Sequence, residues 1–117
     1  MSNEQVFKLA AFLTFVTGTY HFIGIFYEVN SRTPAHHVLF TVINAICIYG
    51  FIKRPKFFVF AFGALVVNQY YTHGGSLLRH WEAYQSINWI DFFIVLFAPI
   101  FFVYLVKDWR ARFESIM

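Results

Sequence analysis

The chain has 117 residues, of which 59% are hydrophobic, 23% aromatic and only 13% charged, a composition far from that of soluble proteins. The net charge of +3 does not indicate a nucleic-acid partner, because the nine Lys and Arg residues are scattered around apolar runs and form no continuous basic face. A single cysteine, Cys47, excludes a disulfide framework and a thiolate metal cluster. The composition therefore predicts a protein whose main partner is the lipid bilayer.

Four apolar runs follow one another along the chain, and each is close to the roughly 20 residues that a helix needs to cross a bilayer. The runs cover about residues 6–27, 35–52, 57–72 and 89–106. The first is too long for the core of a signal peptide, so we expect it to be retained. Each run should be a helix, because backbone polar groups must be paired within the chain in lipid.

The segments between these runs carry readable boundary signals. Thr33-Pro34 places a capping residue before a proline at the first position of the second helix. The basic turn Lys53–Lys56 predicts that the second and third helices are antiparallel neighbours. Gly74-Gly75 is interpreted as the end of the third helix. The segment SLLRHWEAYQSIN after it has helical spacing of Leu, Trp and Tyr, which predicts a short amphipathic helix at the outer membrane surface.

Together these signals predict an all-α membrane protein with one domain, residues 1–117. Its four transmembrane helices would form an antiparallel bundle, with the short interfacial helix between the third and the fourth. Seven Lys and Arg residues lie at the ends and in the middle loop, against two, Arg32 and Arg79, in the other loops. The positive-inside rule then places both termini in the cytoplasm, and we expect a bacterial inner membrane. All five histidines fall in the outer half of this arrangement.

Polar side chains recur at helical spacing on one face of each run. Thr14, Thr17 and His21 share a face of the first helix, and His37 and Asn44 share one of the second. Such residues are costly in lipid unless they are paired or wetted, so they indicate a site. Interhelical hydrogen bonds that only hold helices together are the alternative interpretation. The amide and tyrosine side chains expected to line an outward-facing pocket are Asn44, Asn68, Gln69 and Tyr71.

One histidine from each of the first three helices lies at a similar predicted height. These residues are His21, His37 and His73, a set that would suit a three-imidazole transition-metal centre with an open position. Glu28, Glu82 and Asp91 are near enough in the predicted topology to add ligands or to accept hydrogen bonds from the imidazoles. A haem held by two of these histidines is less well supported, because no cluster of glycines faces a porphyrin.

The residues therefore predict a small multi-pass membrane protein whose outward-facing pocket binds a transition metal or an amphipathic ligand, such as a quinone or a lipid, in a role that could be linked to redox chemistry. The competing hypothesis is a non-catalytic structural subunit or scaffold of a larger membrane complex, with phenylalanine-rich faces packed on partner helices or on a second copy of the chain. No phosphate-binding loop or nucleophile motif indicates catalysis, so enzymatic activity stays open.

Overall fold

The computed structural model describes residues 1–113, and every regular element in that range is a helix, as predicted. The chain divides into two compact units, one formed by Met1–Arg54 and one beginning at Pro55. The elements are α1 (Asn3–Phe26), α2 (Pro34–Lys53), α3 (Phe58–Gln69), the π-helix η1 (Tyr70–Gly74), α4 (Gly75–Tyr84) and α5 (Trp89–Phe113). Each unit is described by itself.

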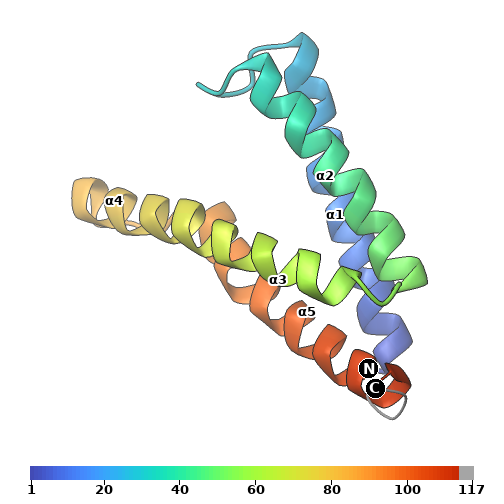
Figure 1. The fold of residues 1–117 in the computed structure, drawn as a ribbon. Helices are drawn as coiled ribbons and strands as arrows, with labels where there is room; N and C mark the ends of the chain where they lie inside the picture. The colour runs from blue at the N-terminus through green and yellow to red at the C-terminus, as the bar shows by residue number, and fades with distance from the viewer. Residues whose placement is uncertain (114–117) are drawn as a thin grey trace. The chain divides into compact units, whose positions relative to one another are not determined.

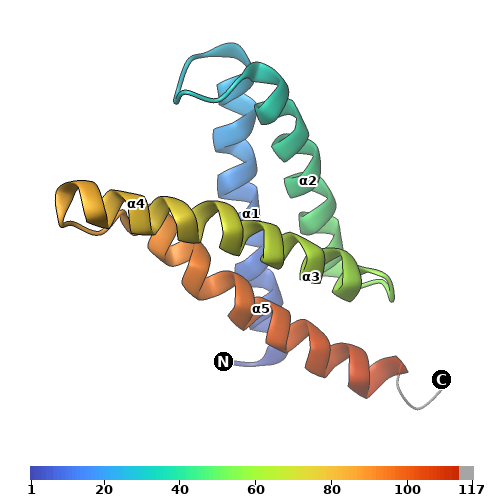
Figure 2. The ribbon, with the colours of Figure 1, turned by 60° about the vertical axis from the view of Figure 1, so that its left-hand side comes forward.

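The first unit is a hairpin of α1 and α2, which lie side by side in both ribbon views (Figures 1 and 2). Helix α1 begins before the predicted residue 6 because Ser2 and Gln5 form a capping box, each side chain bonding the other's backbone N–H. Helix α2 begins where its sequence predicts, since Thr33 Oγ1 accepts a hydrogen bond from His36 N at 3.2 Å and Pro34 follows the cap.

The apolar core of the first unit lies at the end of the hairpin that holds the N-terminus and the end of α2. Its buried side chains come from the first half of α1 and the last turns of α2, namely Val6, Phe7, Ala10, Ala11, Cys47 and Phe51. Ala10 is fully buried, so α2 can approach α1 closely there. The buried polar residue of this unit, His37, lies at the opposite end of the hairpin, near the start of α2.

The second unit contains one long continuous helix, made of α3, η1 and α4, which packs beside α5 (Figures 1 and 2). The interpretation of Gly74-Gly75 as a helix end is wrong: both residues have right-handed helical dihedrals, with φ of −64° and −62°. The predicted amphipathic helix exists as α4, but it continues the helix before it without a break. The helix ends at Gln85, whose φ of 53° is the left-handed conformation typical of a C-terminal cap.

The core of the second unit repeats the arrangement of the first. Phe58, Val59 and Phe62 of α3 are buried, as are Phe101 and Leu105 of α5. Helix α5 runs on past the predicted residue 106 to Phe113, and the Asp108–Arg112 ion pair, 2.7 Å between Oδ2 and Nη2, supports its last turns.

Three helices, α1, α2 and α5, are long and apolar enough to cross a membrane. Only 17–22% of the most apolar window of each is buried inside the protein, so most of their apolar side chains face outward. Large exposed apolar surfaces are rare on soluble monomers and are expected where lipid replaces water. Length and composition therefore indicate a membrane protein.

Candidate functional site

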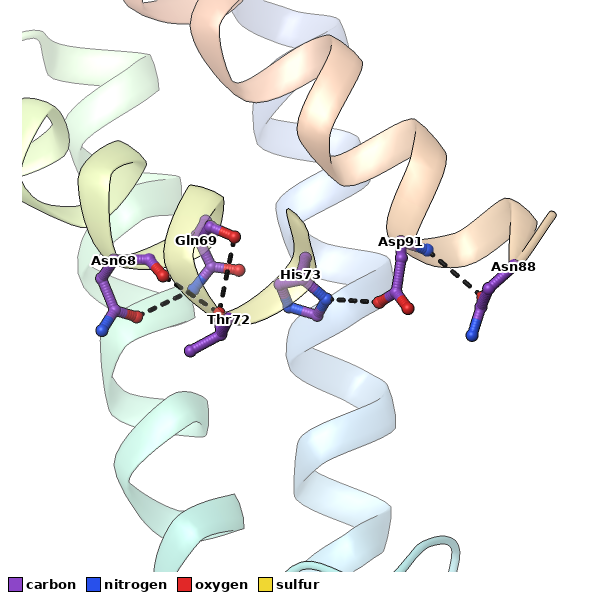
Figure 3. Close-up of polar contacts among 6 residues, drawn as sticks. All are labelled: Asn68, Gln69, Thr72, His73, Asn88 and Asp91. Atoms are coloured by element: carbon purple, nitrogen blue, oxygen red, sulfur yellow. Dashed lines mark hydrogen bonds and ion pairs between the residues drawn. The ribbon is translucent and has the colours of Figure 1, made fainter. Parts of the chain in front are cut away.

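A short polar contact joins two helices of the second unit, from His73 in η1 to Asp91 in α5. His73 Nδ1 lies 2.7 Å from Asp91 Oδ1, and Figure 3 shows the imidazole ring facing the carboxylate. A distance of 2.7 Å is in the range of charge-assisted hydrogen bonds. An ionised carboxylate only accepts, so His73 Nδ1 carries the proton of this bond.

Asp91 is an unusual residue to find inside an apolar helix pair. Its side chain is 8% exposed, and its second oxygen, Oδ2, is buried with no hydrogen-bond partner among the described residues. Its position is fixed from the backbone, because it lies in the first turn of α5 and its N–H donates to Asn88 Oδ1 at 3.4 Å (Figure 3). The helix N-terminus favours a negative charge there. Buried oxygens without partners are rare and mark sites that need a donor.

The π-helical turn decides how His73 is presented. A π-helix inserts one extra residue per turn, which rotates the following side chains relative to an α-helix and loosens the backbone bonding pattern. Thr72 Oγ1 compensates by donating to the carbonyl of Asn68 at 3.0 Å (Figure 3). His73 lies near the end of this turn and stays 30% exposed while it holds Asp91. Short π-helical segments occur frequently at functional sites.

The first unit holds a second polar cluster, a chain of hydrogen bonds that begins in the loop between α1 and α2. Asn30 Nδ2 donates to the Tyr20 hydroxyl at 2.8 Å, and Asn30 Oδ1 lies 3.0 Å from His37 Nε2. The amide oxygen can only accept, so His37 Nε2 donates. His37 Nδ1 is 2.9 Å from His21 Nδ1. In a neutral His37 that nitrogen accepts, so the proton between the two rings belongs to His21.

Close packing holds this cluster in place. His37 is 1% exposed, and Gly24 leaves the space that its ring fills, since a Cβ at Gly24 would lie 2.7 Å from the ring. Gly18 likewise leaves space for Asn44, since a Cβ at Gly18 would lie 3.1 Å from Asn44 Cβ. Asn44 Oδ1 accepts from Thr17 Oγ1 at 2.7 Å, and its Nδ2 donates to the Phe40 carbonyl at 2.6 Å. The first contact joins α1 to α2 and matches the interhelical bonding that was the alternative to a ligand site, whereas the second lies within α2.

The residues predicted to line the pocket divide between the two units. His21, His37 and Asn44 belong to the first unit, where the two imidazoles contact each other. His73 belongs to the second unit and contacts Asp91. Of the other predicted residues in the second unit, Asn68 is exposed, Gln69 is partly buried and Tyr71 is 84% exposed. In Figure 3, Asn68, Gln69 and Thr72 form a group beside the His73–Asp91 pair.

Two contributing residues were not predicted. Asn30 lies in a loop, and no helical spacing connects it with His37. Asn88 precedes α5 and caps its first turn, a role that an asparagine three residues before an acidic residue suggests. The interpretation of Asp91 as a hydrogen-bond acceptor behind an imidazole agrees with its contact to His73.

Within residues 1–113, no group of three or more His, Cys, Asp or Glu side chains is placed to hold a metal ion. Comparison of the chain with protein-family models, curated proteins and solved structures found no match. The geometry of the side chains is therefore the basis for a functional assignment.

Proposed function

We propose that the protein is a small integral membrane protein that crosses the bilayer four times. Three crossings are α1, α2 and α5, and the fourth is the continuous helix formed by α3, η1 and α4. These three segments have 12, 5 and 10 residues, so the continuous helix is roughly 40 Å long, more than the ~30 Å of hydrocarbon. The bias of basic residues supports cytoplasmic termini and an inner membrane of bacterial type. The polar ends of both hairpins then face outward.

At this outer level we propose a binding site for the polar head of an amphipathic molecule, of which a quinone or a lipid is the type. The observation that carries the proposal is the His73–Asp91 pair, in which a partly exposed imidazole is held at 2.7 Å by a buried carboxylate with one oxygen unpaired. A hydrogen bond that only holds two helices together does not require an unpaired buried oxygen. The exposed aromatic and aliphatic side chains nearby, such as Tyr70 and Val67, suit an acyl or prenyl tail.

A transition metal is the second candidate, favoured by the His21–His37 contact. Imidazole ligands lie about 2.0–2.1 Å from such metals, so two nitrogens 2.9 Å apart are close to the separation of neighbouring ligands. Two nitrogens supply only part of a coordination sphere, so this candidate requires further ligands.

The test is the content of the protein purified in mild detergent, measured by elemental analysis, visible spectrum and mass spectrometry of extracted lipids and quinones. We expect a stoichiometric amphipathic molecule in the wild type and its loss in His73→Gln, because a glutamine amide that donates to Asp91 does not place an acceptor where the second ring nitrogen of His73 lies. His80→Gln is the matched control. His80 lies on α4 and bonds Ser86 in the loop that follows, so it takes no part in the His73–Asp91 pair. The variants His21→Gln and His37→Gln report on the metal candidate.

A protein that carries no metal, quinone or stoichiometric lipid, and that elutes with other membrane subunits, would contradict the binding proposal. That result would favour the structural-subunit hypothesis, in which the exposed phenylalanines pack on partner helices.

A further inference from the structure

The hydrogen-bonding character of the His73–Asp91 pair narrows the chemistry of its ligand. In a neutral His73, the proton donated to Asp91 lies on Nδ1, so the other ring nitrogen, Nε2, carries a lone pair. No second hydrogen bond of this ring occurs among the described residues, and the side chain is 30% exposed against 8% for Asp91. The more exposed member of the pair, His73, therefore offers a hydrogen-bond acceptor, its Nε2 atom.

The carboxylate has the same character. Asp91 Oδ2 is buried without a partner, and an ionised carboxylate can satisfy it only by accepting. Within the described part of the chain, His73 Nε2 and Asp91 Oδ2 are therefore both acceptors without a donor, and the His73 ring is the more accessible of the two groups.

We propose that the His73–Asp91 pair selects amphipathic molecules whose head group donates a hydrogen bond, a hydroxyl or an ammonium group, over otherwise identical molecules that only accept. This inference rests on the proposed function, because it names the ligand class of the same site. His73 contacts the head group, and Asp91 is a positioning residue that fixes the proton of His73 on Nδ1. A hydroquinone and an ethanolamine lipid share the required chemistry.

The experiment uses the delipidated full chain in detergent and native mass spectrometry with two matched pairs of probes. Decylhydroquinone is compared with its dimethyl ether, and phosphatidylethanolamine with phosphatidylcholine of the same acyl chains. Within each pair only the donor is removed by methylation. We expect the donor to bind about tenfold more tightly in at least one pair, the usual effect of one hydrogen bond to a polar or charged group. The pair that shows the preference identifies a hydroxyl or an ammonium head group.

Variants separate the role of each partner. Asp91→Asn no longer fixes the His73 proton, because an amide can donate or accept, so we expect the donor preference to fall toward equal binding while some binding remains. His73→Gln should lose binding of all four probes. Asp108→Asn removes a carboxylate from the same helix, one that pairs with Arg112 instead, and should keep the wild-type preference.

Equal binding of both members in both pairs by the wild-type protein would overturn the inference and leave the proposed function standing. A preference for the methylated probes would also overturn it, since removal of the donor would then strengthen binding. Absence of any adduct with all four probes would contradict the proposed function itself. The wild-type comparison decides these outcomes even where a variant does not fold.

Discussion

At the scale of single residues, Gly24 is a position with no room for an added side chain. The His37 ring beside it is 1% exposed and is held through both nitrogens, by Asn30 and by His21. A methyl group at Gly24 would lie 2.7 Å from ring atoms, a distance at which the ring or the helix must move. The ring is rigid and hydrogen-bonded, so the cost cannot be removed by a simple rotation.

We therefore expect Gly24→Ala to lower the free energy of unfolding by about 1–3 kcal/mol, as overpacking of a filled interior does. Thermal unfolding in detergent, followed by circular dichroism, measures the effect. His37→Ala combined with Gly24→Ala is the control, because removal of the ring should make the added methyl group nearly neutral. Unchanged stability of the single variant would show that His37 is not clamped against α1.

At the scale of elements, α3, η1 and α4 form one continuous helix. Alanine at Gly74 should therefore change the free energy of unfolding in the opposite direction to that expected if the helix ended there. Gly74 has a helical φ of −64° and nothing within 4 Å of an added Cβ. Gly74→Ala should therefore raise the free energy of unfolding by up to about 1 kcal/mol, because alanine has the higher helix propensity. Gln85, with a φ of 53°, is the actual end, so Gln85→Gly should also be stabilising.

The same unfolding measurement checks both changes, with Gln85→Ala as the matched control because it retains the left-handed strain of a residue with a Cβ. A loss of stability in Gly74→Ala would mean that the helix stops at the glycine pair after all.

At the scale of the whole molecule, the testable feature is the orientation in the membrane. The native Cys47 is buried and would be replaced by alanine to give a cysteine-free background. Cysteine introduced at exposed Ser31 or Glu82 should react with a membrane-impermeant reagent applied from outside, whereas cysteine at Lys56 should react only after the membrane is opened. Labelling of whole cells, followed by mass spectrometry, gives the result. Reversed labelling would place the His73–Asp91 pair on the cytoplasmic side.

Much of the secondary structure could be predicted because it depends on local chemistry. Apolar composition indicated helices in lipid, and Thr33-Pro34 indicated the start of α2, since a cap acts within one turn. Gly74-Gly75 misled because glycine permits a helix end without requiring one. The packing of η1 and α4 against α5 keeps the pair helical, and tertiary contacts outweigh a propensity difference of about 1 kcal/mol.

The sequence by itself determined which polar residues share a face and a height along each helix, because spacing along a helix fixes both. Only the tertiary structure decided the pairings: His21 with His37 across 16 residues, and His73 with Asp91 across 18. These partners depend on the rotation of each helix about its axis, and the π-turn at Tyr70–Gly74 changes that rotation for His73 in a way that no spacing rule contains. Asn30 reaches His37 from a loop, whose path is set by where the helices it joins have packed.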